Sequence, residues 1–334
     1  MIPIQPLASR PPEISVTTPI SQALDRVKRV LFQPFDLGRW FILGFGAWLA
    51  HLGEQGWSGG GNYGGGSHHG GSGGPNFQRA LEHAKDYWTS NVWWIGPVIV
   101  AVVVFGLALW VLFTWLNSRG KFIFLHCVAL NQAEVVAPWN QFAGVGNSLW
   151  RFRLGLGLVG MAVMLPLLAL IIVPVFKMVL RGAPNAAGIV VVVGALLGLI
   201  VVAIGFALIG KLLADFVVPI MFLRGKQCLA GWSELGGLLA AHPGSFVLYF
   251  LMQLVLGMAS GVLVLVVILA TCCLAGCFMM VPYLGTVLLL PVLVFQRAYS
   301  LHFLAQFGPA YDVFPPAASP LFGVERGGAG IAHI

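Results

Sequence analysis

Long apolar stretches constrain this chain more than any other feature of its sequence. A helix needs about 20 largely apolar residues to cross the roughly 30 Å hydrocarbon core of a bilayer, where only internal hydrogen bonds satisfy its backbone. With 58% hydrophobic and 9% charged residues, the chain cannot build a globule with a polar shell. Six stretches predict transmembrane helices, the first of them short: residues 37–52, 92–116, 152–176, 188–210, 246–271 and 279–304.

A short, weakly charged segment precedes every second apolar stretch. The three segments, residues 21–41, 131–152 and 225–246, each end at an aromatic residue that begins the next stretch. Such amphipathic helices lie in the headgroup plane of a membrane. An apolar tail that continues past a charged residue closes each unit, at 112–130, 211–223 and 292–307. The sequence therefore predicts an all-α polytopic membrane protein with six transmembrane helices, arranged as three repeats of interfacial helix plus transmembrane hairpin.

Lysine and arginine predict the orientation, because basic residues are retained on the cytoplasmic side. One set of connecting segments holds 14 of them and the opposite set holds 4. Both termini are therefore expected in the cytoplasm. We expect a cytoplasmic tail at 1–17, a six-helix membrane domain at 18–307 and a disordered cytoplasmic tail at 308–334. Within the domain, the glycine-rich residues 53–76 predict a disordered linker outside the membrane.

The repeated pattern resembles a known family. Phrases such as ALDRVKRVLFQPFDLGRWFILGF (23–45) and SRGKFIFLHCVAL (118–130) are similar to uncharacterised six-helix bacterial membrane proteins related to the glycerophosphoryl diester phosphodiesterase membrane domain. The resemblance covers most of residues 18–307 and implies a multi-pass helical bundle in the bacterial inner membrane. The soluble phosphodiesterase barrel of that family has no counterpart in this sequence, so hydrolysis is not implied.

Charged residues inside an apolar segment are the sharpest polar signal. Lys211 and Asp215 are four positions apart on one helical face near the end of the fourth stretch, and Arg297 has an equivalent depth in the sixth. A charge in hydrocarbon is costly and usually pairs or lines an aqueous path. The three residues form a candidate intramembrane polar group. The alternative is that Lys211 extends its ammonium to the interface, where the helix ends.

Basic residues beside the apolar stretches indicate membrane lipid as the partner. The placement next to apolar spans is typical of contact with anionic headgroups, and it argues against nucleic acid. A protein partner or a homo-oligomer is also compatible with the sequence. The expected anionic-lipid contacts are Arg26, Lys28, Arg29, Arg151 and Arg153.

Small residues within the stretches predict close helix packing. Residues 155–160 match the G-x-G-x-x-G nucleotide fingerprint, but they follow no strand and lack the required acidic residue, so no cofactor is expected. Small residues let transmembrane backbones approach each other. The expected packing positions are Gly155, Gly157, Gly160, Gly194, Gly198, Gly257 and Gly261.

Cysteine and histidine give no metal-site spacing. Cys272, Cys273 and Cys277 lack a neighbouring histidine, and as small apolar residues they fit a tight helical turn, although a redox role stays open. The histidines at 51, 68, 69 and 83 lie in or near the glycine-rich linker, which gives them no fixed geometry. No metal site is predicted.

The sequence predicts a non-enzymatic membrane protein, because no paired carboxylates, triad or metal motif is visible. Membrane organisation, lipid interaction or scaffolding at the cytoplasmic leaflet is the first interpretation. The alternative is a small-molecule or lipid transporter with a polar path near Lys211, Asp215 and Arg297, in which prolines such as Pro166 and Pro174 break helices. A polar cavity that reaches those three residues favours the alternative, and a tightly packed centre favours the first.

Overall fold

The computed structural model describes residues 14–53, 75–181, 185–271 and 281–314, together with Gly276 and Met279. This part of the chain consists of helices and the loops that connect them, and it holds no strand. The linker expected at 53–76 lies outside it apart from its ends, as do Cys272, Cys273 and Cys277. The first half of the chain folds into α1 (Thr18–Val27), the π-helical turn η1 (Lys28–Phe32), α2 (Leu37–His51), α3 (Pro75–Leu130), α4 (Val136–Gln141) and α5 (Ala143–Arg181).

The second half continues the pattern of short and long helices. A left-handed Gly225 (φ 63°) ends the long helical run through α6 and α7. The elements are α6 (Ala186–Leu212), the π-helical turn η2 (Leu213–Val217), α7 (Val218–Arg224), α8 (Cys228–Ala241), α9 (Pro243–Ala270), α11 (Pro282–Leu288), α12 (Leu290–Ala305) and the 3-10 turn η3 (Pro309–Tyr311).

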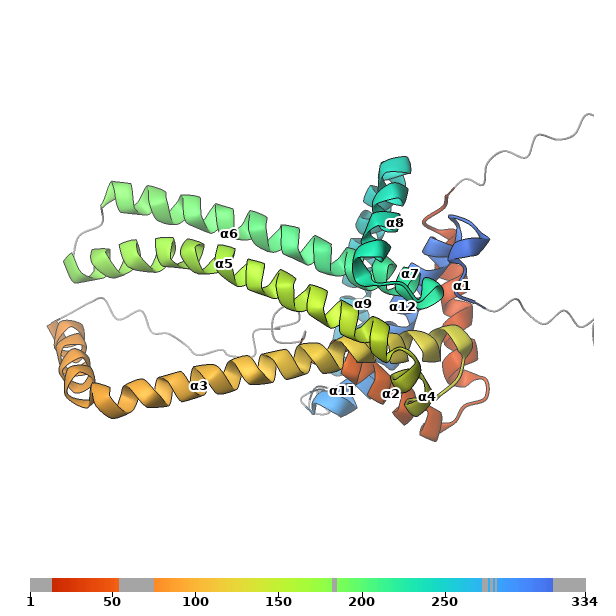
Figure 1. Ribbon diagram of the computed structural model, residues 1–334, viewed down its shortest axis with the longest axis horizontal. Helices are drawn as coiled ribbons and strands as arrows, with labels where there is room; N and C mark the ends of the chain where they lie inside the picture. The colour runs from red at the N-terminus through yellow and green to blue at the C-terminus, as the bar shows by residue number, and fades with distance from the viewer. Residues whose placement is uncertain are drawn as a thin grey trace, which may run out of the picture.

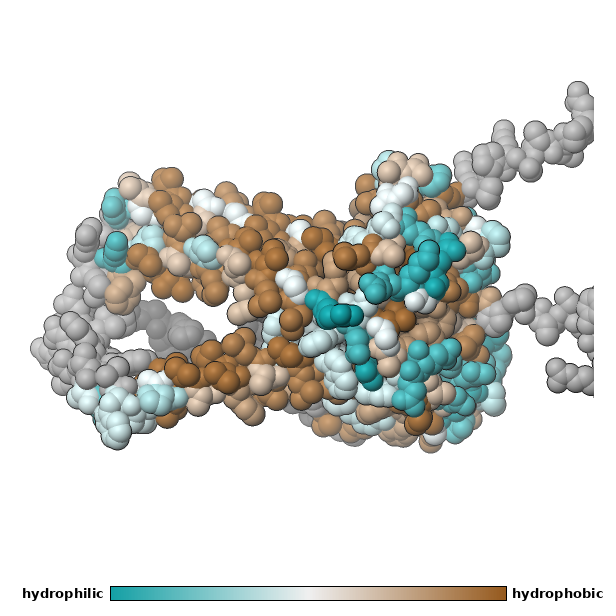
Figure 2. Space-filling view, viewed as in Figure 1, coloured by the Kyte–Doolittle hydropathy of each residue, from teal (hydrophilic) through white to brown (hydrophobic). Residues whose placement is uncertain are grey.

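Four helical segments of the described chain are long and apolar enough to cross a membrane. They are Trp93–Leu130, Ala143–Met178, Ala186–Arg224 and Pro243–Ala270, and they correspond to the second to fifth predicted stretches. Their apolar side chains face outward, as at Phe105 (65% exposed) and Val201 (69% exposed). In Figure 1, α3, α5 and α6 extend to the left from a compact end on the right, and Figure 2 shows hydrophobic residues over these extensions and hydrophilic residues gathered at the compact end.

The first and sixth predicted spans do not reach the length of a crossing in this structure. α2 has 15 residues, about 22 Å at 1.5 Å per residue, and it packs against α3 and α11. The sixth stretch breaks at Leu289 into α11 and the 16-residue α12. Many apolar side chains of α12 are buried inside the protein instead of facing outward. Six transmembrane helices are therefore not confirmed.

The core of the compact end is built from the three apolar tails. The end of α3 contributes Phe122 and Leu125, η2 contributes Phe216, and α12 contributes Tyr299 and Phe303, all fully buried. α12 contacts both α3 and η2. The three helix tails, which are similar in sequence, thus meet in one hydrophobic cluster. Their packing sets the positions of the polar side chains that adjoin the cluster.

The short helices cover this core in a regular order. α1 packs on α12, α4 packs on α3, and α8 packs on η2 and α7. Each short helix therefore contacts a tail that closes another unit of the sequence pattern.

The two described chain ends meet at the compact end. The side chain of Gln306 forms hydrogen bonds of 2.7 and 2.8 Å with the backbone N–H and carbonyl of Ser15. Tyr299 donates to the carbonyl of Val16 at 3.1 Å. Val313 is 5% exposed, so the C-terminal tail expected from residue 308 is packed at least as far as this residue. Both described ends consequently lie on one side of the long apolar helices.

Candidate functional site

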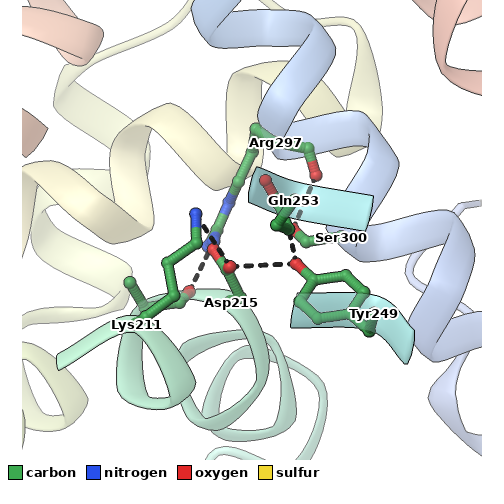
Figure 3. Close-up of polar contacts among 7 residues, drawn as sticks. Lys211, Asp215, Tyr249, Gln253, Arg297 and Ser300 are labelled. Carbon is green, nitrogen blue, oxygen red and sulfur yellow. Dashed lines mark hydrogen bonds and ion pairs between the residues drawn. The ribbon is translucent and has the colours of Figure 1, made fainter. Parts of the chain in front are cut away.

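The polar group predicted in the apolar region is centred on Asp215 (Figure 3). Asp215 lies in η2, where the helix widens by one residue, and it is 7% exposed. Its Oδ2 lies 3.0 Å from the Nζ atom of Lys211, one turn earlier. Lys211 and Asp215, which are four positions apart in the sequence, therefore form an ion pair in the structure.

A second helix contributes two polar side chains to Asp215. The hydroxyl of Tyr249, on α9, donates a hydrogen bond of 2.9 Å to Oδ2 of Asp215, and Gln253 donates to that hydroxyl at 2.8 Å. Tyr249 is fully buried and packs against Phe216 and Phe303, with ring centroids 4.9 and 4.6 Å away. The carboxylate is thereby held on one side by an ammonium and on the other by a buried phenol.

Arg297 reaches the same place from α12. Its Nη1 donates to the carbonyl of Ala214, the residue before Asp215, at 2.5 Å. Its Nε is buried and has no hydrogen-bond partner among the described residues. The structure thus brings Lys211, Asp215 and Arg297 together, although the two helices that carry them are about 80 residues apart in sequence.

A cavity of about 900 Å³ opens beside this group. Residues of α2, α3, α5, α6, η2 and α12 line it. Its volume is within the range of pockets that take small molecules. Along α6 the lining runs from Lys211 to Ala203, two turns or about 12 Å toward the middle of the apolar helix.

One end of the cavity is charged and the remainder is apolar. Four basic residues line it, Lys121, Arg153, Lys211 and Arg297, whereas Asp215 is the single acidic residue among the described lining. Away from these charges the walls consist largely of side chains such as Leu107, Trp110, Met161, Met164 and Phe206. The cavity therefore combines a charged end with apolar walls, a division that is complementary to an amphipathic molecule.

Asn117 connects the charged end to the short helix α2. Its Nδ2 donates to the carbonyls of Ala50 and Leu52 at 2.7 and 3.0 Å, at the end of α2 where helical carbonyls lack partners. Its Oδ1 accepts from Arg153. The α2 terminus and the first turns of α5 are thus held at one edge of the cavity.

The basic residues expected to contact lipid occupy different environments. Arg26 is directed inward, with its Nε donating to the carbonyl of Val128 at 2.9 Å. Arg153 lines the cavity, while Lys28, Arg29 and Arg151 are exposed at the compact end.

The glycines expected at packing positions fall into two groups. A Cβ atom added at Gly157 would lie 2.6 Å from the Trp110 ring, and at Gly160 or Gly198 it would make ordinary contacts with Phe206 or Leu167. Gly157 and Gly160 also line the cavity. The other four face open space: Gly155, Gly194, Gly257 and Gly261.

The described residues contain no group of three or more potential metal ligands among His, Cys, Asp and Glu. His51 lines the cavity. The structure describes neither His68 and His69 nor the side chain of His83.

Sequence reasoning missed Tyr249, Gln253 and the cavity position of Lys121. A signal was present for the first two, because a tyrosine and a glutamine four residues apart share one face of an otherwise apolar helix. Lys121 carried no such signal, because its role depends on which helices converge around it.

Comparison with known families gives one match. The model of a family of unknown function, DUF7544, matches residues 14–290. The chain belongs to this family. The match covers the helices that form the cavity except most of α12, and nothing in it links the chain to the glycerophosphoryl diester phosphodiesterase membrane domain. Comparisons with curated proteins and with solved structures find no match.

Proposed function

We propose that this protein is a non-enzymatic membrane protein that binds a lipid-like amphipath in the cavity between α3, α5 and α6. The observation that carries the proposal is the polarity of the cavity, which has four basic residues at one end and apolar walls along the rest. An amphipath satisfies both parts, because its tail covers the apolar wall and its head meets the cations.

The cavity changes the balance between the two interpretations of the sequence. It reaches Lys211, Asp215 and Arg297, which is the feature expected of the transport interpretation, whereas its walls away from these residues are largely apolar and suit a bound lipid tail. Transport is the second candidate on the same evidence. However, the fully buried Phe216, Tyr249 and Phe303 pack behind Asp215, so passage toward the compact end requires these rings to move. Binding requires no such movement and is the simpler function.

The proposal includes an inner-membrane location with the compact end in the cytoplasm. The exposed Lys28, Arg29 and Arg151 at that end support this orientation. Three repeats, each beginning with an interfacial helix, are part of the same proposal, and the regular contacts of α1, α4 and α8 with the apolar tails support them.

A cavity-filling substitution tests the proposed function. Gly160→Leu extends a side chain from the cavity wall, because a Cβ atom there has only ordinary contacts with Phe206. Gly194→Leu is the matched control, since it adds the same side chain to α6 at a position facing open space. Lipid that copurifies in mild detergent is quantified by mass spectrometry. We expect Gly160→Leu to lose bound lipid and Gly194→Leu to keep it; equal retention by both variants and the wild type contradicts the proposal.

A further inference from the structure

A second, smaller space adjoins the cavity. We call it the side hollow; its volume is about 310 Å³, compared with about 900 Å³ for the cavity. Four residues line both spaces: Gly53, Trp110, Thr114 and Arg153. The rest of its described lining consists of Leu52, Gly106, Leu109 and Phe113. The cavity of the proposed function and the side hollow therefore meet along a common border.

The two spaces lie on adjacent faces of α3. Each is lined by a set of α3 residues with the spacing i, i+3 and i+7, which follows a single face of a helix. The sets are Leu107, Trp110 and Thr114 for the cavity, and Gly106, Leu109 and Phe113 for the side hollow. Since Trp110 and Thr114 line both spaces, they form a ridge between them.

The ridge is held in place by contacts within the protein. A Cβ atom added at Gly157 would lie 2.6 Å from the Trp110 ring, so this ring packs closely against the backbone of α5. The hydroxyl of Thr114 donates to the carbonyl of Trp110 at 2.8 Å. The indole ring therefore separates the cavity from the side hollow by a fixed wall.

Both spaces extend in the same direction from this border. The side hollow runs along α3 from Thr114 to Gly106, eight residues or about 12 Å. The cavity runs along α5 from Arg153 to Met164, eleven residues or about 16 Å. α3 ends at the compact end and α5 begins there, so both runs lead away from it into the apolar helices. The two spaces are thus parallel arms.

Polar groups mark the level at which the arms meet. Arg153 lines both arms and donates to Oδ1 of Asn117, which in turn donates to the carbonyls of Ala50 and Leu52. These bonds fix the position of the guanidinium within the protein. Beyond this level the side hollow is bordered by Gly106, Leu109 and Phe113, so the polarity changes from one end of the arm to the other.

On the basis of the proposed function, we infer that the ligand is a lipid with two hydrocarbon chains, one in the cavity and the other in the side hollow, on either side of Trp110. The group that joins the chains lies at the level of Thr114 and Arg153. The side hollow has room for on the order of ten methylene groups, because a group the size of a water molecule occupies about 30 Å³. A single-chain amphipath fills one arm and leaves the other to a separate molecule.

Competition between lipids of different chain number tests the inference. Protein that has been delipidated in mild detergent is incubated with equal amounts of dioleoyl phosphatidylglycerol and mono-oleoyl lysophosphatidylglycerol, which share the headgroup and the chain. Native mass spectrometry counts each lipid bound per protein. We expect one two-chain lipid, enriched at least about tenfold over the lysolipid, because its linkage to the first chain places the second at a high effective concentration. Two lysolipids bound as readily as one two-chain lipid assign the arms to separate molecules and overturn the inference.

A substitution in the side hollow shows whether the preference belongs to the second arm. Gly106→Leu fills the side hollow, because a Cβ atom there meets nothing within 4 Å. Gly155→Leu is the matched control: it makes the same change on α5, two residues from Arg153, at an open position outside the described lining of both spaces. We expect Gly106→Leu to reduce the enrichment to about twofold or less while lysolipid still binds, and Gly155→Leu to keep it. An equal loss in both variants assigns the preference to the outer lipid layer and overturns the inference.

A second substitution addresses the same arm from another position. Leu109→Phe enlarges a side chain that lines the side hollow and is outside the described lining of the cavity. It is expected to lower the enrichment in the same way, and it decides the test if Gly106→Leu does not fold. An unchanged enrichment in a folded variant of either kind overturns the inference.

The two proposals fail in different ways. Lipid that is retained by the wild type and lost in Gly160→Leu, but without a preference for two chains, overturns the two-chain inference and leaves the proposed function standing. Lipid retention unchanged by Gly160→Leu contradicts the proposed function itself.

Discussion

Tyr249 and Asp215 are joined by a hydrogen bond of 2.9 Å, although they belong to α9 and η2. The bond links two long apolar helices at the height of the cavity. Since Tyr249 is fully buried and Asp215 is 7% exposed, neither group has bulk water as a substitute partner. The interaction therefore contributes to the fold as well as to the candidate site.

Asp215→Ala is expected to destabilise the protein by about 2 kcal/mol or more, because it leaves a buried phenol without its acceptor and Lys211 without its counter-ion. Asp25→Ala is the control, since the Asp25 side chain is 60% exposed and lies 3.8 Å from the similarly exposed Lys28. Thermal unfolding in detergent measures both. Equal melting temperatures for the two variants would show that the Asp215 contacts carry no net stability.

Arg26→Gln is expected to lower stability by about 2 kcal/mol without changing lipid binding. The guanidinium donates to the carbonyls of Val128 and Ala129 at the end of α3 and lies over the Phe314 ring, 4.9 Å from its centroid. Bonds from a charged donor to unpaired helix carbonyls are among the stronger ones. Lys28→Gln changes an exposed cation in the same helical segment and should shift stability by less than about 0.5 kcal/mol.

Arg26→Gln and Lys28→Gln also distinguish a basic residue that stabilises the fold from one that contacts lipid. Copurified lipid is measured on the same samples by mass spectrometry. A loss of anionic lipid in Arg26→Gln at unchanged melting temperature would return Arg26 to the lipid-contact role expected from the sequence.

Gly120→Ala and Gly106→Ala compare one close and one open position on α3. A Cβ atom at Gly120 would lie 2.5 Å from the Leu49 carbonyl carbon and 2.6 Å from the Ala50 nitrogen, whereas at Gly106 it meets nothing within 4 Å. Backbone atoms of α2 must move in the first case, at a cost of about 1 to 3 kcal/mol. The second is expected to be neutral or to gain up to about 1 kcal/mol from helix propensity. Melting curves of the two proteins test this contact, and a stabilised Gly120→Ala would refute it.

The thiol of Cys228, on α8, is expected to resist alkylation. Burial raises its pKa to about 12, because the apolar surroundings disfavour the thiolate, and the residue is 1% exposed. Only the thiolate is the nucleophile. Iodoacetamide labelling of the folded protein, followed by peptide mass spectrometry, should remain slow as the pH rises through 9, where a large fraction of an exposed thiol is ionised and reacts. Labelling in denaturant provides the control, and fast modification of the native protein near pH 8 would contradict the burial.

The part of the candidate site that lies on a single helix could be predicted from the sequence. Lys211 and Asp215 are four residues apart, so helical geometry alone made them neighbours. Arg297 was included because its depth in the sixth stretch was similar. Arg153 was assigned to the headgroup surface, and the structure places it at the cavity, because spacing along a chain does not reveal which helices converge.

The apolar stretches show a second limit of sequence patterns. Hydropathy records that a residue avoids water and does not distinguish lipid from protein as its surroundings. Val201 on α6 faces outward, whereas Leu301 and Phe303 on α12 are fully buried among other helices. Apolar composition therefore predicted a span of the correct length for α6. For α12 the predicted span was too long, because the chain breaks at Leu289.

The packing of α1 on α12 determines when the compact end can be completed during synthesis. α1 leaves the ribosome near the beginning of translation and its main partner only after every long helix has been made. Until then the apolar side of α1 lacks its main protein partner, and the membrane headgroup layer is the nearest alternative. A nascent chain that stops before α12 would thus leave its earliest helix without its main protein partner.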